Sequence, residues 1–247
     1  MVKKVKDSVK IPVVASLNAV TRNVWVNYAK QLAETGVDGL ELNLFSNIRN
    51  LEHDAAAVET AQLAVLSEIK QSVDIPVSVK LSAYYTNPMN FISRVSADTG
   101  VDAVVLFNRL FQPDIDADAE KNVFPFDVSH PGDERLPLRF AGLLYDGLEA
   151  DLCASTGIFE GEDVVKMLLA GADCVQVVST LYRNKPGQIQ KMLDDIQKWM
   201  SEHNYESLAD FRGKMSKKNS SDPWLYTRAQ YANLLMHGNP LEYWRVY

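Results

Sequence analysis

The stretch Pro76-Val77-Ser78-Val79-Lys80-Leu81-Ser82 alternates β-branched residues with polar ones, which predicts a short buried strand entered through Ile75-Pro76. Its lysine lies at the carboxyl end, where burying an unpaired ammonium group would be costly. We therefore expect Lys80 to face an anion or a polar ligand. The alternative is a strand-end lysine whose amine reaches solvent.

An internal repeat surrounds this strand. Ile11-Pro12 recurs as Ile75-Pro76, and Gly36-Val37-Asp38 recurs as Gly100-Val101-Asp102, both at a spacing of 64 residues. Gly171-Ala172-Asp173 repeats the second signal. Half of this period is the size of one strand plus one helix. The alternation implies a parallel sheet, and its regularity predicts an α/β fold of the TIM (β/α) barrel type.

Six strands and six helices are expected in this rhythm. The strands cover residues 11–18, 40–44, 76–82, 103–108, 152–155 and 174–179, and the helices cover 23–34, 55–71, 88–98, 136–148, 162–170 and 187–202. A closed barrel has eight strands, so we expect two N-terminal βα units to be absent from this chain. The polar excursion from Arg109 to Asp133 predicts a β-hairpin over the barrel mouth.

The chain is expected to have two parts. Residues 1–204 form the incomplete barrel, and residues 205–247 form a helical, aromatic-rich tail that packs on the barrel or on a partner subunit. The number of strands and the tail together favour a homodimer, in which open sheet edges and aromatic side chains would be covered.

Composition excludes several classes of protein. The 247 residues are 47% hydrophobic with a net charge of −7, and no dense basic cluster points to nucleic acid. No apolar run approaches the roughly 20 residues of a membrane span. Cys153 and Cys174 fall in expected adjacent strands, and a reduced interior suits them better than a disulfide. We expect a cytoplasmic protein.

Polar side chains follow the expected strands. In βα barrels the catalytic and binding groups project from the carboxyl ends of the strands. These ends carry Ser16, Asn18, Asn43, Ser46, Lys80, Ser82, Asn108, Thr156, Gly157, Ser179 and Thr180. A single one would more simply be a turn or cap residue, but six strands ending this way predict one site. The set lacks a cluster of His, Asp or Cys, so no metal is expected.

The last two strands suggest a phosphate site. Ser155-Thr156-Gly157-Ile158 precedes a helix near Glu162, and Val178-Ser179-Thr180-Leu181 precedes a later one. The loops after the last two strands of a barrel frequently bind phosphate through backbone N–H groups and a helix N-terminus. A phosphate there and a cation at Lys80 would bracket flavin mononucleotide (FMN).

Several motifs carry a family resemblance. They are Glu41-Leu42-Asn43-Leu44, Val79-Lys80-Leu81-Ser82, Leu106-Phe107-Asn108-Arg109, Ser155-Thr156-Gly157-Ile158 and Leu168-Leu169-Ala170-Gly171-Ala172. From about Lys6 to Leu235 the chain resembles the FMN-dependent dihydroorotate dehydrogenase family, in its dihydroorotate dehydrogenase-like branch. The resemblance implies an oxidoreductase of pyrimidine metabolism that oxidises dihydroorotate, or a similar small flat ring, with flavin as hydride acceptor.

The resemblance also implies roles for individual residues. Lys80 would stabilise negative charge at the flavin N1/O2 edge, and Ser46 would be the base that deprotonates the substrate. Cofactor contacts are expected from Ser16, Asn43, Asn108, Thr156, Gly157, Ser179 and Thr180.

The sequence departs from the family pattern in three places. Asn47-Ile48 stands where the family has Pro-Asn, Thr156-Gly157 where it has Gly-Gly, and Val178-Ser179 where it has Gly-Thr. The changes at Thr156-Gly157 and Val178-Ser179 crowd backbone donors that would approach phosphate. Together with the two absent βα units, the altered phosphate loops motivate an alternative, a truncated or degenerate paralogue that keeps the scaffold without cofactor. A third hypothesis is a Schiff-base lyase with Lys80 as nucleophile.

Overall fold

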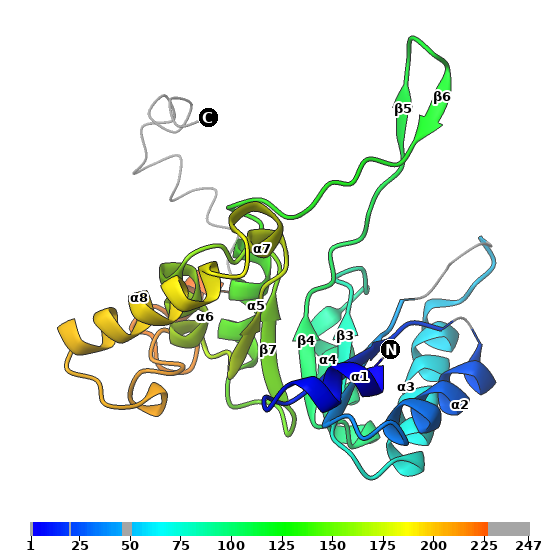
Figure 1. The fold of residues 1–247 in the computed structure, drawn as a ribbon, viewed down its shortest axis with the longest axis horizontal. Coiled ribbons are helices and arrows are strands. Elements are labelled where there is room, and N and C mark those ends of the chain that lie inside the picture. The colour runs from blue at the N-terminus through cyan, green and yellow to red at the C-terminus, as the bar shows by residue number, and fades with distance from the viewer. Residues whose placement is uncertain (1, 20, 46–50, 227–247) are drawn as a thin grey trace.

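The computed structural model describes residues 2–19, 21–45 and 51–226, and its main element is one curled sheet of six parallel strands (Figure 1). In spatial order, which is also chain order, the strands are β1 (Val14–Leu17), β2 (Gly39–Asn43), β3 (Val77–Leu81), β4 (Ala103–Leu106), β7 (Asp151–Ser155) and β8 (Cys174–Gln176). The helices are α1 (Val2–Ser8), α2 (Arg22–Ala33), α3 (Ala55–Ser72), α4 (Pro88–Thr99), α5 (Arg135–Leu144), α6 (Gly161–Ala170), α7 (Ser179–Asn184) and α8 (Gln188–Glu202). The expected fold class is confirmed: these elements form six strands of a barrel type that has eight when closed.

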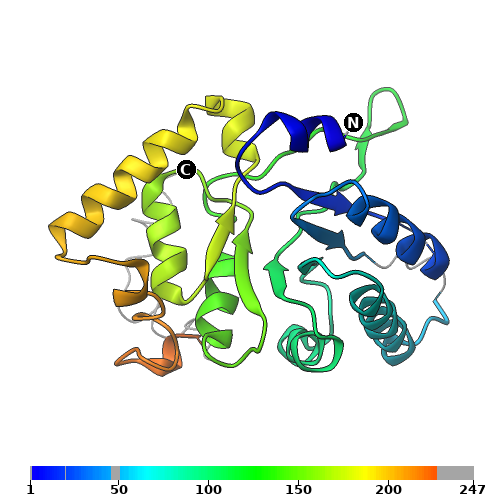
Figure 2. The ribbon, with the colours of Figure 1, turned by 60° about the horizontal axis from the view of Figure 1, so that its bottom comes forward.

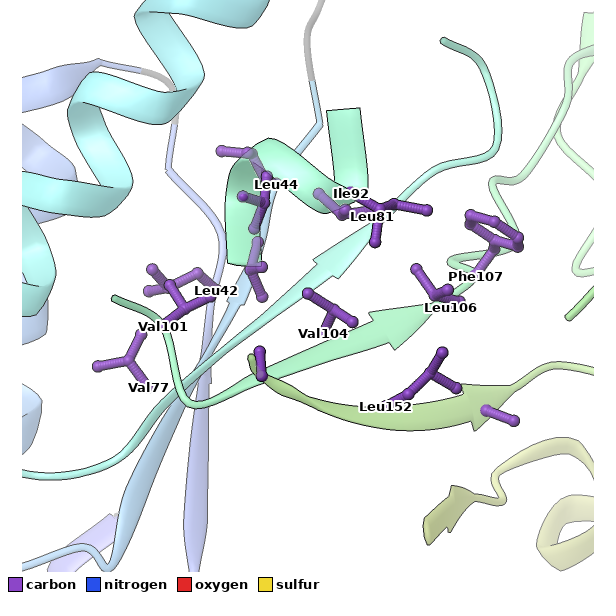
Figure 3. Packing of buried hydrophobic residues seen from close by; sticks show 14 of the residues in the cluster. Leu42, Leu44, Val77, Leu81, Ile92, Val101, Val104, Leu106, Phe107 and Leu152 are labelled. Atoms are coloured by element: carbon purple, nitrogen blue, oxygen red, sulfur yellow. The ribbon is translucent and has the colours of Figure 1, made fainter. Parts of the chain in front are cut away.

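The core lies on the outer face of the sheet, under the helices. In β3, Val77, Val79 and Leu81 are fully buried, while Ser78 and Lys80 point to the other side. Because side chains alternate along a strand, this pattern gives the sheet one apolar and one polar face. Figure 3 shows the apolar layer, with labelled side chains from four strands and from α4: Leu42, Leu81, Val104, Leu152 and Ile92.

The inner face of the sheet is concave and carries polar and small side chains. Strand register places one row of residues across it, running from Asn43 through Lys80 to Cys153 and Cys174. Figure 2 shows the longer helices on the outer side of the curl and the short helix α1 at its open side. Val14 on the edge strand β1 is 56% exposed, so the inner face is open to solvent at this edge.

The Gly-x-Asp repeat has a structural cause at the strand starts. Each carboxylate accepts a hydrogen bond from a backbone N–H at the start of the neighbouring strand. The pairs are Asp38 with Val13 at 2.6 Å, Asp102 with Val77 at 2.7 Å and Asp173 with Leu152 at 2.8 Å. Each aspartate N–H donates back to the carbonyl of the same partner. We call Asp38, Asp102 and Asp173 the strand-start aspartates.

Each strand-start aspartate also pairs with a cation. The pairs are Lys6 with Asp38 at 2.5 Å, Lys70 with Asp102 at 2.5 Å and Arg212 with Asp173 at 2.7 Å. The hydrogen bond from Lys6 lowers the pKa of Asp38. Burial acts to raise the pKa of Asp102, but the bonds from Lys70 and the Val77 N–H outweigh it and lower this pKa. The repeat is therefore a set of clamps that join neighbouring strands.

The excursion between β4 and α5 forms the predicted hairpin. In it, β5 (Asp114–Asp116) pairs antiparallel with β6 (Lys121–Val123). Figure 1 shows this hairpin standing away from the body of the protein, at the end of two extended segments. The hairpin strands thus lie apart from the barrel mouth, unlike the prediction. Within this excursion, it is the connecting segments that border the mouth. The predicted last strand is also too long, because β8 ends at Gln176 and Ser179 already begins α7.

The described part of the predicted tail docks on the outer helices. It holds two short 3₁₀ helices, η1 (Leu208–Asp210) and η2 (Pro223–Tyr226). Phe211 is fully buried, and the Gly213 N–H donates to the Leu168 carbonyl of α6 at 2.8 Å. Tyr205 stacks on Trp199 of α8. Residues 227–247 of the tail lie outside the described residues.

Candidate functional site

A pocket of about 270 Å³ opens at the carboxyl ends of the strands. Its walls come from β3, from the ends of β4, β7 and β8, and from the segments that lead to the hairpin. The polar and glycine residues that line it are Lys80, Asn108, Arg109, Asp127, Ser129, Ser155, Thr156, Gly157, Gln176 and Ser179. The polar strand ends of the central and last strands therefore meet in one hollow.

Lys80 lines this pocket and is held by two side chains of the inner face. Its Nζ donates to Oε1 of Gln176 at 2.8 Å and lies 3.8 Å from Oε1 of Glu41. Nε2 of Gln176 donates to the other carboxylate oxygen of Glu41. The Lys80 and Glu41 side chains are only 15% and 10% exposed. Lys80 thus faces an anion and a polar group on the inner face, as expected, instead of reaching out to solvent.

Two asparagines lie beside the lysine. Nδ2 of Asn108 donates to Oδ1 of Asn43 at 2.8 Å. The Asn108 N–H donates to the Leu81 carbonyl at 2.8 Å, which fixes the residue at the end of β3. Asn43 is the register partner of Lys80 on the adjacent strand. The structure therefore brings Lys80, Asn43 and Asn108 together, although they are spread over 65 residues of the chain.

Thr156 and Gly157 form a tight turn after β7. Thr156 has a φ of +87°, a left-handed conformation that is costly for a β-branched residue, and its hydroxyl donates to the Phe107 carbonyl at 2.8 Å. Gly157 has a φ of +78°, and a Cβ there would lie 2.2 Å from the Glu134 N atom. Only glycine fits at position 157 in this turn.

Ser179 and Thr180 point in different directions. Ser179 Oγ accepts a hydrogen bond from the Ser129 N–H at 3.0 Å and lies 2.7 Å from the Ser129 hydroxyl, so the Ser179 hydroxyl is on the pocket side of the turn. Thr180 is fully buried, and its hydroxyl donates to the Phe159 carbonyl at 3.0 Å. A phosphate contact from Thr180 would have to come from its backbone.

The start of α6 differs from the predicted phosphate-binding helix terminus. Glu160 and Asp163 form a capping box there, in which each side chain accepts from the backbone N–H of the other. Asp163 also accepts from the Phe159 N–H at 3.0 Å. Carboxylates therefore already hold these donors, and their negative charge would repel a phosphate.

Two further predicted site residues lie apart from the pocket or beyond the described chain. Ser16 is exposed on the edge strand β1, and register places it on the inner face beside Glu41. It does not line the pocket. Ser46, the predicted base, lies outside the described residues, so its role stays a prediction.

The outer wall of the pocket is aromatic. Phe111 stacks on Phe126 with ring centroids 5.4 Å apart, and Phe126 meets the edge of Tyr182 at 5.7 Å. All three rings line the pocket and remain more than half exposed. A planar ligand could therefore lie between this wall and the polar floor around Lys80.

The two cysteines are register partners on β7 and β8, so the prediction of adjacent strands is confirmed. Both thiols are free. A hydrogen bond between them raises the pKa of buried Cys153 and lowers that of exposed Cys174.

The described ranges lack a metal-binding cluster and a membrane-spanning helix. Residues 2–19, 21–45 and 51–226 hold no group of three or more His, Cys, Asp or Glu side chains placed to bind a metal ion. Over the same ranges, no helix has both the length and the apolar character needed to cross a membrane.

Sequence reasoning missed Glu41 and Gln176 as site residues. Glu41 is two residues before Asn43 in β2, so period-two alternation places both on one face. Gln176 is the last residue of β8, the usual position of a barrel binding group. Both signals were available, but the contact between them depends on the curl of the sheet, which strand periodicity does not encode.

The fold and the pocket together define a class. Parallel strands with outer helices, and a polar pocket at their carboxyl ends, are the arrangement of βα-barrel enzymes. The profile of the family described as "Dihydroorotate dehydrogenase" matches residues 1–200. The chain belongs to the dihydroorotate dehydrogenase family.

Individual relatives agree with this assignment. The chain is 28% identical over 225 residues to the "Putative dihydroorotate dehydrogenase A (fumarate)" of Aeropyrum pernix, covering 86% of this chain and 70% of the relative. It is 26% identical to the "Dihydroorotate dehydrogenase B (NAD(+)), catalytic subunit" of Geobacter sp., covering 84% and 69%. The corresponding protein of Thermoplasma volcanium is 25% identical, with 85% and 70% covered. These names differ in electron acceptor and agree on the dehydrogenase.

Proposed function

We propose that this protein is an FMN-dependent oxidoreductase that oxidises dihydroorotate or a similar flat, pyrimidine-like ring. The observation that carries the proposal is the meeting of Lys80 with Asn43 and Asn108 at the strand ends, beside a pocket with an aromatic wall. Membership of the dihydroorotate dehydrogenase family supports the same reaction class.

The residues present fit the ring end of FMN. An ammonium group and amide side chains that can both donate and accept suit the N1/O2 edge of a flavin and the carbonyl groups of a pyrimidine. Lys80 would stabilise negative charge at this edge, and Asn43 and Asn108 would orient the flat substrate. Bound FMN would accept the hydride that leaves the substrate.

Fewer of the predicted residues are placed to contact the phosphate group of FMN. Gly157 allows close approach of the chain, and the Ser179 hydroxyl lines the pocket. Thr156 already uses its hydroxyl for the Phe107 carbonyl, so its contribution would be its backbone N–H. Ser16 would reach the cofactor ring only from the open edge of the sheet, and Ser46 would take the substrate proton.

Flavin loading and substrate reduction test the proposal. Purified protein is incubated with FMN, freed of excess flavin and mixed anaerobically with dihydroorotate. We expect retained yellow flavin that bleaches on mixing, and a Lys80→Ala variant that binds FMN about 10- to 100-fold more weakly, because a charge-assisted contact is lost. Protein that is colourless after incubation with saturating FMN and removal of the excess would contradict the proposal.

One observation favours the alternative of a scaffold without cofactor. The donors at the start of α6 are held by Glu160 and Asp163, and the Thr180 hydroxyl is held by Phe159. A paralogue that has lost FMN could keep such internal bonds. Size-exclusion chromatography with flavin titration separates the two, because this alternative predicts a folded protein at every FMN concentration and no bound flavin.

The proposed partners follow from the proposed enzyme function and from the open edges of the sheet. We propose a small-molecule substrate, a homodimer in the cytoplasm, and no nucleic-acid partner. The two sheet edges β1 and β8 have no further strand beside them among the described residues, and a second copy could cover such edges. Analytical ultracentrifugation would give twice the chain mass of 27.7 kDa if the dimer forms.

A further inference from the structure

Three side chains from separate strands meet across the hollow of the sheet. Glu41 belongs to β2, Lys80 to β3 and Gln176 to β8. In strand order, β8 is the last strand and β2 the second, so they are not neighbours. The hydrogen bonds of Gln176 to Lys80 and Glu41 are therefore contacts across the concave face and not between adjacent strands.

The chemistry of the three groups fixes the orientation of the Gln176 amide. An ionised carboxylate only accepts hydrogen bonds, and an ammonium group only donates them. Gln176 must then present its NH₂ group to Glu41 and its carbonyl oxygen to Lys80, which is the arrangement observed. If the amide turned over, both of its contacts would become repulsive.

Glu41 acts on Lys80 mainly through this amide. The direct separation of 3.8 Å between Lys80 Nζ and Glu41 Oε1 exceeds a hydrogen bond, although the opposite charges still attract. Lys80 has three N–H donors, and one is committed to Gln176. This bond fixes the directions of the other two N–H groups, which can donate to a ligand in the pocket.

We propose that Gln176 and Glu41 are positioning residues that hold the Lys80 ammonium group at one place in the pocket, ready for the anionic edge of a reduced ring. The inference rests on the proposed flavin site for the identity of the ring. A lysine side chain has four rotatable bonds, and ordering it costs conformational entropy. If it is already held before the ligand binds, this entropy cost does not reduce the binding affinity. Groups fixed in this way stabilise developing charge best.

The first test uses flavin-free protein. With ¹⁵N-labelled lysine, a proton–nitrogen correlation spectrum detects only ammonium groups whose protons exchange slowly because they are hydrogen-bonded and shielded. We expect one such signal from Lys80, identified by its absence in Lys80→Arg. It should vanish in Gln176→Leu and weaken in Glu41→Gln, where the amide is free to turn over.

The matched control is Cys174→Ala. Cys174 lies two residues before Gln176 on the same face of β8, and its hydrogen-bond partner is Cys153, whereas Lys80 bonds to Gln176. Its variant should keep the signal. Thermal unfolding confirms that each variant is folded. An unchanged Lys80 signal in folded Gln176→Leu, or no Lys80 signal in the native protein, would overturn the proposal.

The second test uses FMN. The affinity for reduced FMN relative to oxidised FMN reports how well the pocket stabilises the negative charge of the reduced ring. We expect this ratio to fall about tenfold in Gln176→Leu and to stay constant in Cys174→Ala. An equal ratio in native protein and Gln176→Leu, with a lower one in Lys80→Ala, contradicts positioning. If native protein binds no FMN, the proposed function fails, while the Lys80 signal still decides the positioning claim.

Discussion

The two ends of the same parallel strands are organised by different rules. At the strand starts, three aspartates repeat one device, a backbone clamp with a cation partner. At the strand ends the hydrogen bonds follow no repeated pattern. They join Lys80 to Gln176, Asn108 to Asn43, and Ser179 to Ser129. The starts hold neighbouring strands together, and the ends bring distant strands together.

This difference explains why the strand starts can be recognised from a sequence repeat and the site at the strand ends cannot. A clamp needs only a glycine turn and an aspartate at a fixed place before each strand, so it can recur as a short sequence motif. A site at the strand ends needs unlike groups that complement one another across the sheet. It therefore leaves no repeat, and only the curl of the sheet brings its parts together.

A glycine pair gives the sharpest comparison of the two ends. Gly157 at the strand ends and Gly36 at the strand starts have similar φ values of +78° and +81°. A Cβ at Gly157 would lie 2.2 Å from backbone, whereas one at Gly36 meets nothing within 4 Å. We expect Gly157→Ala to cost about 4 kcal/mol of unfolding free energy and Gly36→Ala about 1 kcal/mol. Urea denaturation measures both, and equal costs would contradict the tight turn.

Removing the charge of Lys80 should have the next largest effect. Lys80→Met leaves Glu41 with its charge buried and unbalanced, so we expect a loss of about 3 kcal/mol. Adding Glu41→Gln in the same chain should restore part of this loss, because the uncompensated charge is gone. Denaturant titration of the two single variants and the double variant gives the coupling, and strictly additive losses would show that the pair does not interact.

The strand-start clamps should respond to acid. Asp102 has a pKa lowered in the folded protein, so its contribution is complete above its unfolded pKa of about 3.9 and is lost as the pH falls through the folded pKa. We expect Asp102→Asn to lose about 1 kcal/mol at pH 7 and to match the native protein more closely near pH 3. Unfolding free energies measured from pH 7 to pH 3 test this, and a constant difference would contradict the clamp.

The smallest effect concerns Thr156. Thr156→Ala keeps the left-handed strain and loses the hydroxyl bond to Phe107, whereas Thr156→Gly loses the bond and the strain together. We expect the glycine variant to be the more stable of the two by about 1 kcal/mol. Thermal unfolding ranks them, and a more stable alanine variant would argue against the strained turn.

Much of the fold follows from the sequence because its signals are local. Ile75-Pro76, the alternation through Lys80 and the Gly100 turn each mark an element boundary with a physical cause, and the strands lie where these signals predict them. The predicted end of the last strand at residue 179 is wrong, because Val177-Val178 continues an apolar run past Gln176, where β8 ends. Apolar character alone does not show where a ladder stops.

The site was less accessible to sequence reasoning. The pairing of Lys80 with Glu41 and Gln176 spans β2, β3 and β8, and it depends on how tightly the sheet curls. The carboxylate caps at α6 are a short local motif, Glu160 with Asp163, that could have shown that these donors are occupied. The direction of the Thr180 hydroxyl depends on tertiary packing, which the sequence pattern does not reveal.

Titration with FMN tests the division between strand starts and strand ends most directly. Flavin fluorescence is followed as FMN is added to native protein, to Lys80→Ala and to Asp102→Asn. We expect saturable binding in the native protein, about 10- to 100-fold weaker binding in Lys80→Ala, and native affinity in Asp102→Asn. Equal affinity of the native and Lys80→Ala proteins would contradict a flavin site at the strand ends.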